Sequence, residues 1–257
     1  MPKIALLSDI HSNIHAFRSV LREIQNEAID ELAFLGDTVG YGAHPEECLR
    51  LVKAVASHSV KGNHEIWAVS VREHGPETFW DSWKEDSIAR GLVHAVKCLK
   101  PEQWDWLQQL PYAAAIDEAV IVHASLDRPA RWKYIDSMES AEASLNVLRG
   151  QERHVAFCGH SHQQAIFSDP RSALQVHEVG KRKFYLPLGL AVVVGVGSVG
   201  QPREPEGDLR AAWAIWDSDE RIVEFRRTEY DVEKAMADNI AAGLPQETTV
   251  WLRGSVG

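Results

Sequence analysis

Residues 156–162 read Ala-Phe-Cys-Gly-His-Ser-His, an apolar run that ends at Gly159 and leads into His160 and His162. In an extended chain, side chains two residues apart project to the same side. Gly159 carries no side chain, so the backbone can turn there. The stretch therefore predicts a buried strand whose end offers two imidazoles to metal in one pocket. Two histidines in a surface loop are the alternative, and the rest of the chain decides between them.

Four other short apolar runs end at polar residues in the same way. Runs of this length and composition are typical of buried strands, and they cover residues 4–8, 31–35, 59–61 and 119–122. The polar residues at their ends are Asp9, His11, Asp37, Asn63, His64 and His123. Sites in open α/β sheets form at the carboxyl ends of strands. Polar residues of this kind are unlikely to follow five strands by chance, so we expect them to line one shared pocket.

Helical segments separate several of these runs. Apolar residues recur at helical spacing after Ile14, and Pro45, Ser137 and Asp231 stand where helices begin. The expected helices cover residues 14–26, 45–57, 137–149 and 232–242. After His162 the pattern changes to short strands and turns, at residues 165–167, 174–176, 183–185, 191–194, 211–216 and 222–227. The chain is therefore expected to be an α/β protein.

A tryptophan-rich segment at about residues 66–118 interrupts this pattern. It is expected to be a helical insertion whose tryptophans, Trp67, Trp80, Trp83, Trp104 and Trp106, serve packing more than ligand binding. Trp132 and Tyr134, which follow His123, are better candidates to touch a substrate. The whole chain, residues 1–257, is expected to be one domain with this insertion and with a C-terminal helix and tail at about 231–257.

The composition excludes some classes of function and leaves the oligomeric state open. The formal net charge of −10 argues against general binding to nucleic acid or anionic membranes. The three cysteines, Cys48, Cys98 and Cys158, are far apart and odd in number, which is typical of reduced thiols in a cytoplasmic protein. The longest apolar run, residues 186–196, is too short to span a bilayer. No signal peptide is expected, because Asp9 and His11 interrupt the first apolar run.

The stretch Gly195-Val-Gly-Ser-Val-Gly200 matches the dinucleotide-binding fingerprint as letters. That fingerprint requires a helix to begin at its last glycine. Pro202 and Pro205 follow instead and disfavour a helix. We therefore interpret the stretch as a tight turn between strands.

The polar residues at the strand ends form a set of oxygen and nitrogen donors. The candidate ligands are Asp9, His11, Asp37, Asn63, His123, His160 and His162. The set suits Mn, Fe or Zn, with Ni as a further possibility, and it holds too many imidazoles for Mg or Ca. Seven donors exceed the need of one ion, and a shared carboxylate can bridge two ions ~3.5–4 Å apart. Such a pair lowers the pKa of a bridging water and clamps phosphoryl oxygens. His64 is left over as a general acid or base.

In their order and spacing, Asp9-Ile-His11, Gly36-Asp37, Gly62-Asn63-His64-Glu65, His123 and Gly159-His160-Ser161-His162 resemble the calcineurin-like metallophosphoesterases over about residues 1–230. The resemblance implies a four-layer αββα sandwich, in which two packed mixed β-sheets are flanked by helices. It implies that Asp9, His11 and His162 bind one metal, that Asn63, His123 and His160 bind the other, and that Asp37 bridges them. It also implies attack by a hydroxide between the metals, with Asn63 and His64 on the phosphate and His64 protonating the leaving group.

Residues 40–42 and 197–203 resemble the smaller bacterial branch of phosphodiesterases and diadenosine-tetraphosphatase-like proteins. Ser12 and Ala124 stand where the family often has glycine. The loop after Asp37 lacks the arginine with which protein phosphatases grip a phosphate dianion. This argues against phosphoprotein or symmetrical dinucleotide substrates, unless Arg128, Arg131 or Arg203 takes that role.

Three functions remain open on the sequence alone. They are a hydrolase of phosphodiesters or nucleotides, a phosphomonoesterase that includes protein phosphatases, and a non-catalytic scaffold. A scaffold predicts lost ligands or a lost His64, and all of these residues are present. The expected partner is therefore a small phosphate ester. Of the remaining histidines, His15 and His44 lie nearest the ligand loops, but they are expected to be surface or hydrogen-bonded residues.

Overall fold

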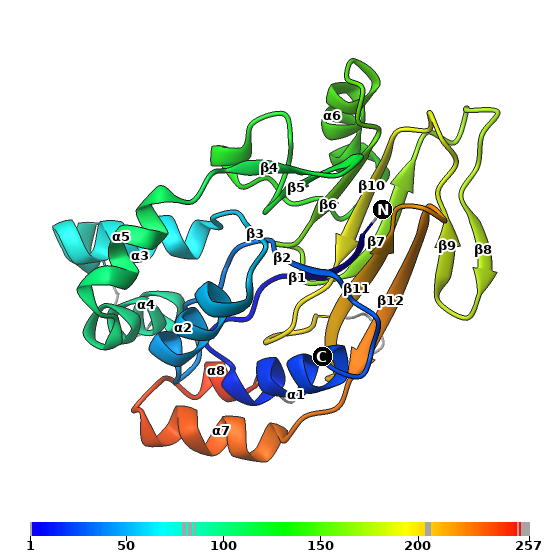
Figure 1. The fold of residues 1–257 in the computed structure, drawn as a ribbon. Helices are drawn as coiled ribbons and strands as arrows, with labels where there is room; N and C mark the ends of the chain where they lie inside the picture. Colours follow the sequence, from blue (N-terminus) through cyan, green and yellow to red (C-terminus); the bar gives the residue numbers. More distant parts are fainter. Residues whose placement is uncertain are drawn as a thin grey trace.

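The computed structural model describes residues 2–78, 81, 84, 86–203, 207–250 and 252. Its strands form two mixed sheets (Figure 1). The first sheet has the order β3 (His58–Ser59), β2 (Glu31–Phe34), β1 (Lys3–Leu7), β11 (Ala211–Asp217), β12 (Ile222–Thr228), β9 (Lys183–Tyr185) and β8 (His177–Gly180). The second has the order β4 (Ala113–Ile116), β5 (Ala119–Val122), β6 (Val155–Cys158), β10 (Val192–Val196) and β7 (Gln164–Ser168).

Parallel pairing within each sheet aligns the strand ends that carry the candidate ligands. β1 is parallel to β2 and antiparallel to β11, and β6 is parallel to both β5 and β10. Parallel strands end at the same edge of a sheet. The loops after β1, β2, β5 and β6 therefore meet at one edge of the sandwich.

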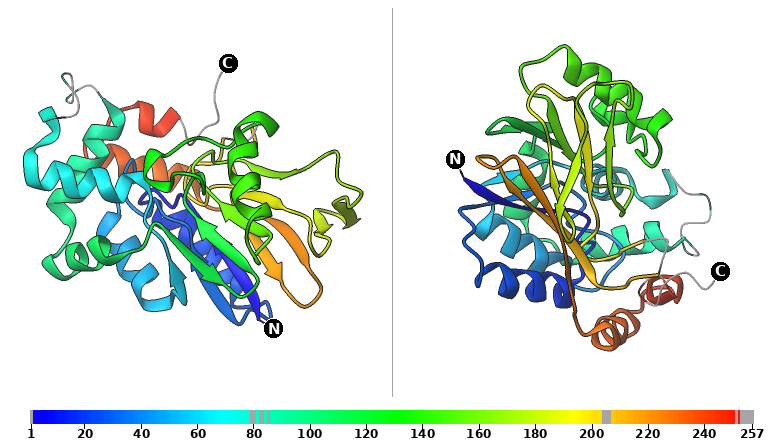
Figure 2. Two further views of the ribbon diagram at one scale, coloured as in Figure 1. Left: turned by 90° about the horizontal axis from the view of Figure 1, so that it is seen from above. Right: turned by 90° about the vertical axis from the view of Figure 1, so that its right-hand side faces the viewer.

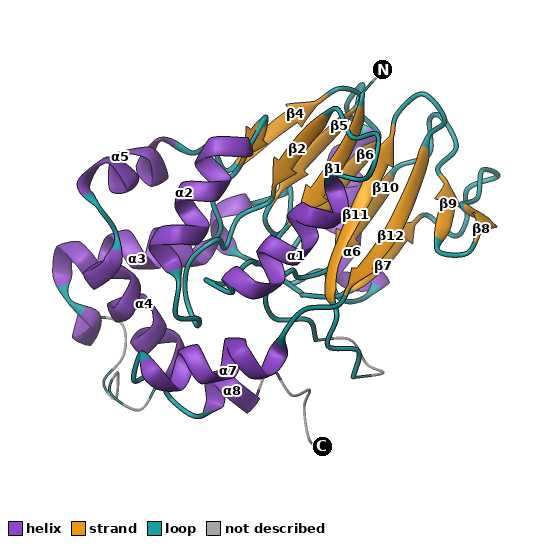
Figure 3. Cartoon of the chain, turned by 60° about the horizontal axis from the view of Figure 1, so that its bottom comes forward, coloured by secondary structure: helices purple, strands orange, loops and turns teal. Residues whose placement is uncertain are grey.

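Apolar side chains divide the molecule into four layers. One core lies between the sheets and contains Leu6 and Trp216 from the first sheet and Phe157 and Val194 from the second. A second core joins the outer face of the first sheet to α1 (Ile14–Ile24) and α2 (Pro45–Val55), and a third joins the second sheet to α6 (Met138–Arg149). Figure 3 shows α1 in front of the sheets and α6 behind them. The expected αββα sandwich is confirmed.

The tryptophan-rich segment forms a helical subassembly at one end of the sheets. It contains α3 (Asn63–His74), the 3-10 helix η1 (Pro76–Thr78), α4 (Ser87–Cys98) and α5 (Pro101–Gln109). Trp104 is buried among these helices, and Trp67 and Trp106 pack against the same cluster, as expected for core residues. Trp80 and Trp83 lie outside the described residues.

Two expectations about elements are wrong. The segment 66–118 is not helical throughout, because residues 113–116 form β4, which the tight turn at Asp117 (φ 45°) pairs with β5 as a hairpin. Residues 174–176 are not a strand, since hydrogen bonds from Leu174 to Ser172 and from Ser172 to Asp169 hold them in turns. The strand β8 begins only at His177.

After β12 the chain returns past the sheets to α1. The helix α7 (Val232–Ala241) begins at Asp231, whose side chain accepts a hydrogen bond from the Lys234 amide, and α8 (Glu247–Val250) follows. Figure 1 and the two views of Figure 2 show α7 lying alongside α1. Across the described ranges, no helix has the length and apolar character needed to cross a membrane.

Candidate metal centre

The loops after β1 and β6 bring together the first group of donors. Asp9, His11 and His162 each offer one atom, and the three atoms lie within 4.8 Å of one another. The Nε2 atoms of His11 and His162 are 3.1 Å apart, and Asp9 Oδ1 is 3.1 Å from His162 Nε2. All three side chains are buried.

The loops after β2, β5 and β6 bring together a second group. Asp37, His123 and His160 also lie within 4.8 Å of one another. His123 Nε2 is 3.3 Å from Asp37 Oδ2 and 3.0 Å from Asn63 Oδ1. Asp37 Oδ2 is also 3.9 Å from His11 Nε2, in the first group. Asp37 therefore lies between the two groups, so all seven predicted ligands share one buried site.

Residues 156–158 lie in the strand β6, as expected, but the backbone at His160 and His162 is left-handed, so the extended geometry expected there is wrong. Values of φ near +50° to +65° occur at five of the seven candidate ligands, Asp9, His11, Asp37, His160 and His162. Residues other than glycine adopt this region at a cost of about 1–3 kcal/mol, and functional sites are where they do so. The turn places His160 in the second group and His162 in the first, which is the division that the family resemblance implies. Ser12 also has φ 58°, which explains why glycine suits that position.

Backbone carbonyls orient the imidazoles. Nδ1 of His11, His123 and His162 faces the carbonyl oxygens of Val39, Leu35 and Gln201, at 3.2, 2.7 and 2.7 Å. A carbonyl can only accept, so each Nδ1 carries the proton and Nε2 points into the site. His160 is reversed, because its Nε2 is 2.9 Å from the Trp132 carbonyl and its Nδ1 is left to face the site. Such outer partners fix the tautomer of a metal-binding histidine.

The donor atoms fit cations. Because the Nδ1 protons of His11 and His162 are committed to carbonyls, a proton or a metal ion must lie between their Nε2 atoms, which are 3.1 Å apart. Among the described residues, the buried Asp9 Oδ1 accepts no hydrogen bond. An ion pair would satisfy such a buried carboxylate oxygen. The arrangement suits two divalent cations.

Burial and neighbouring charges shift the pKa values of the site in opposite directions. Burial disfavours the charged form of His123, but Asp37 outweighs it and raises the pKa of that imidazole to about 10. Burial opposes ionisation of Asp37 as well, yet His123 and His64 hold its pKa well below the usual range. A histidine binds a metal through an unprotonated nitrogen, so metal binding displaces the proton on His123.

His64 lies beside both groups and forms a further cluster with His11 and Asp37, whose donor atoms also lie within 4.8 Å of one another. Its Nε2 is 3.9 Å from Asp37 Oδ2, and its backbone N–H donates to Asp37 Oδ1 at 2.8 Å. Its ring contacts the rings of His11, Tyr41 and Trp67. Burial lowers the pKa of the imidazole to about 4. His64 is thus a buried acid–base group beside the candidate metal ligands.

Glu65 organises the loop after β2, which the sequence analysis did not foresee. One carboxylate oxygen accepts from the amides of Gly62 and Asp37, at 2.7 and 2.8 Å, and the other accepts from Thr38 at 2.8 Å. Burial raises its pKa to about 7, and Asp37 acts in the same direction, while the hydrogen bonds from Gly62 and Asp37 oppose the shift. A glutamate three residues after Gly62, the N-cap of α3, is the capping-box signal that could have found it.

The glycine-rich stretch at 195–200 braces the loop after β1. The next described element after it is the strand β11 and not a helix, as a turn between strands predicts. The amides of Val199 and Gly200 donate to the carbonyls of Ser8 and Asp9 at 2.9 Å. A side chain at Gly200 would stand 1.8 Å from the Ile10 carbonyl, so glycine is required there. Glu204 and Pro205 lie outside the described residues.

Aromatic side chains and one arginine surround the site. Tyr134 is half-exposed and stacks on His160, with ring centroids 4.0 Å apart, and the Trp132 ring contacts His123. Arg203 hydrogen-bonds to Tyr41, which stands in the loop after Asp37, although burial still raises the pKa of that phenol to about 12. Arg128 and Arg131 are exposed. Arg203 is therefore the best placed of the three candidate arginines.

Comparison with known proteins gives consistent matches. Residues 2–164 match the model of the calcineurin-like phosphoesterases. An uncharacterized protein of Methanocaldococcus jannaschii is 32% identical over 255 residues, which is 97% of this chain and 95% of that protein. A symmetrical bis(5'-nucleosyl)-tetraphosphatase of Vibrio cholerae is 28% identical over 152 residues, 57% of this chain. The match spans 52% of the tetraphosphatase, about half its length.

Solved structures share the fold across the chain. The crystal structure of a metallophosphoesterase from Sphaerobacter thermophilus has a TM-score of 0.77 and 28% identity, and covers 98% of both chains. A hypothetical protein from Pyrococcus horikoshii has a TM-score of 0.78 at 19% identity, with the same coverage, which shows the fold alone. The chain belongs to the calcineurin-like phosphoesterase family and is a hydrolase that acts on phosphate esters.

Proposed function

We propose that the protein hydrolyses phosphodiester or nucleotide substrates at a centre of two divalent metal ions. The observation that supports this most is the position of Asp37, whose Oδ2 lies 3.3 Å from His123 Nε2 and 3.9 Å from His11 Nε2. A carboxylate between two donor groups is what a bridging ligand requires. Asp9, His11 and His162 would hold one ion, and Asn63, His123 and His160 the other.

Two bound ions would supply Lewis acidity to the phosphate and to a water molecule. The protein groups do the rest. The carbonyls of Val39, Leu35, Gln201 and Trp132 hold the imidazoles in position, and the brace at residues 198–200 holds Asp9. Asn63 precedes His64 in the chain, and its amide would contact a phosphate oxygen as well as a metal.

His64 is proposed as the general acid that protonates the leaving oxygen. Its Nε2 faces Asp37, while its Nδ1 is directed at Gly40, where a side chain would stand 2.1 Å away. Burial keeps its pKa low in the free protein, and the negative charge of a bound phosphate acts in the opposite direction. A proton donor of this kind contributes about 10²–10⁴-fold to the rate.

The walls of the site favour diesters over phosphoprotein monoesters. The loop after Asp37 contains no arginine that could bind a phosphate dianion. Tyr41 stands in that loop and is hydrogen-bonded to Arg203. Trp132 and Tyr134 flank the second donor group and offer aromatic faces to a nucleobase or another flat leaving group. Phosphomonoesters remain the alternative, with Arg203 as the cation that would bind them.

The metal and the location are proposed on chemistry alone. Mn or Fe suits a site of imidazoles, carboxylates and one amide, and Zn or Ni would also bind. The three free cysteines, two of them buried, suit a reducing cytoplasm.

A panel of metals and substrates tests the function. The chelator-treated protein is reconstituted with Mn, Fe, Zn or Ni and assayed on bis-p-nitrophenyl phosphate, p-nitrophenyl phosphate, nucleotides and a phosphopeptide. We expect metal-dependent hydrolysis with the highest kcat/KM on a diester. No hydrolysis with any metal would exclude the enzyme, and a higher kcat/KM for a monoester than for every diester would move the assignment to the phosphomonoesterases.

A further inference from the structure

A second cluster of metal-type donors lies outside the centre. His15 is in the first turn of α1, His44 precedes α2, and Asp238 is in α7. Their donor atoms lie within 4.8 Å of one another, although the residues are up to 223 positions apart in the chain. Three elements that the fold brings together from distant parts of the sequence therefore converge on one point.

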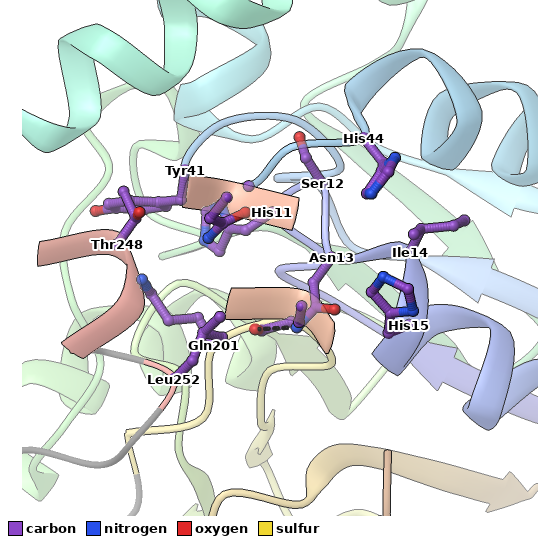
Figure 4. Close-up of a pocket in the computed structure, with 14 residues that line it drawn as sticks. His11, Ser12, Asn13, Ile14, His15, Tyr41, His44, Gln201, Thr248 and Leu252 are labelled. Atoms are coloured by element: carbon purple, nitrogen blue, oxygen red, sulfur yellow. Dashed lines mark hydrogen bonds between the residues drawn. The ribbon is translucent and has the colours of Figure 1, made fainter. Parts of the chain in front are cut away.

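The donors meet at a single carboxylate oxygen. Nε2 of His15 and Nε2 of His44 are each 2.7 Å from Asp238 Oδ2. The two rings are nearly perpendicular, with centroids 5.7 Å apart. Figure 4 shows both imidazoles beside each other at one side of the cavity that they help to line. The side chain of His44 makes no capping bond to its own helix, although it stands at the N-cap position, and turns to Asp238 instead.

We propose that His15, His44 and Asp238 bind a third divalent metal ion of the zinc class, separate from the centre. Two imidazoles and one carboxylate form a common ligand set for zinc, with water in the fourth position. Bonds of about 2.0–2.1 Å in a tetrahedron place the donors roughly 3.4 Å apart. Small side-chain rotations that move each imidazole about 0.7 Å away from Asp238 would therefore admit the ion.

Exposure and charge favour an ion at this position. The side chains of His15, His44 and Asp238 are 14%, 33% and 31% exposed, so a metal can enter from solvent and keep a water ligand. Hydrogen bonds from His15 and His44 hold the pKa of the Asp238 carboxyl below its ordinary value, so it is ionised at neutral pH. An ionised carboxylate is a better zinc ligand than a neutral one.

The ion would fasten α7 to the rest of the molecule. Apolar contacts hold this helix through a small cluster that includes Ala235, Met236 and Leu252. Ala235 and Asn239 of α7 line a cavity that is also lined by His11, a ligand of the proposed centre. A metal between α7, α1 and the start of α2 would close one side of that cavity.

Counting the metal in matched variants tests the site. The full chain is stripped with a chelator, loaded with excess Zn²⁺, freed of unbound ion and analysed by elemental analysis. We expect wild type to hold one more zinc per chain than His44→Gln and Asp238→Asn. His58→Gln is the control, because His58 forms a similar half-exposed pair with Glu31, 2.8 Å apart. It should hold as much zinc as wild type.

Hydrogen exchange of α7 gives a readout that is independent of activity. Adding Zn²⁺ to the stripped protein should slow amide exchange in α7 of wild type and of His58→Gln, but not of Asp238→Asn. Circular dichroism confirms that each variant is folded, and His44→Gln serves if Asp238→Asn is not. Equal zinc content in wild type and both cluster variants would overturn the proposal. Loss of one zinc in His58→Gln as well would also overturn it, because it would indicate unspecific surface binding.

Discussion

The metal centre and the cluster of His15, His44 and Asp238 use the same donor chemistry on different scaffolds. The centre is built on strand ends, is almost fully buried, and has left-handed backbone at five of its ligands. The cluster is built on helices, is partly exposed, and holds His44 at φ −120°. We therefore expect burial and left-handed backbone to hold the donors of the candidate centre more rigidly than the donors of the cluster, which lie nearer to solvent.

Removing the charge of Asp37 should give the largest difference between the two regions, because it should weaken metal binding at the centre and leave the cluster of His15, His44 and Asp238 unchanged. An amide cannot hold two cations together, so we expect Asp37→Asn to weaken both metals of the centre and to reduce activity to the limit of detection. Asp9→Asn should weaken mainly one metal. Elemental analysis and turnover measure both effects. Equal loss of a single metal in the two variants would contradict the bridging role of Asp37.

His64→Ala should leave both regions loaded with metal and still remove most of the activity. We expect a loss of about 10²–10⁴-fold on alkyl esters, whose leaving groups need a proton, and a smaller loss on p-nitrophenyl esters. The measurements are turnover on the two ester types and metal content. Unchanged turnover on alkyl esters would remove His64 from the mechanism, and loss of metal would make it a residue that orients Asn63.

Glu65→Gln should lower the metal affinity of the centre and leave the metal affinity of the distant cluster unchanged. The variant disturbs a carboxylate that accepts hydrogen bonds from Gly62, Asp37 and Thr38. Loss of such an outer partner typically costs about 10–100-fold in metal affinity. Titration with a competing chelator measures this, with Glu47→Gln, a glutamate paired with Arg18 at the surface, as the control. Wild-type affinity in Glu65→Gln would show that the loop is held by other contacts.

Ser12→Gly should have the smallest effect of these variants, and the effect is on stability. It tests how much the left-handed backbone at Ser12 costs. Ser12 has φ 58°, and its buried hydroxyl has no partner among the described residues. Glycine removes both the strained φ and the unpartnered hydroxyl, at some cost in the conformational entropy of the unfolded chain. We expect the free energy of unfolding to rise by about 1 kcal/mol, or the Tm by ~2–4 °C. Ser12→Ala keeps the Cβ, so it separates the two causes. A lower Tm for Ser12→Gly would mean that the serine is not strained.

The sequence could predict the metal centre because its signal is local. Each candidate ligand follows a short apolar run, and parallel strands end at one edge, so Asp9, Asp37 and His123 could be placed together without coordinates. The family resemblance already implied that His160 and His162 divide between the two groups. The positive φ of both residues could not be predicted, because residue type does not reveal it for histidine.

Contacts between elements that are distant in the sequence could not be predicted either. His44 and Asp238 are 194 residues apart, and no periodicity links α7 to the start of α2. The strand at 113–116 was hidden in a helical segment, because three alanines carry little β signal and its partner β5 decides the pairing. The strand predicted at 174–176 does not form, because local hydrogen bonds hold these residues in turns although two of the three are apolar.

The pairing of β1 with β11 has a consequence for biosynthesis. Every candidate ligand of the centre lies within residues 9–162, but the antiparallel neighbour of β1 begins at Ala211 and the brace on Asp9 comes from residues 198–200. A chain emerging from the ribosome therefore displays all the ligands while the edge of β1 is still unpaired. Unpaired strand edges invite aggregation. A nascent chain that stops at residue 164 should depend on chaperones and should hold metal weakly, so loading would follow release rather than accompany translation.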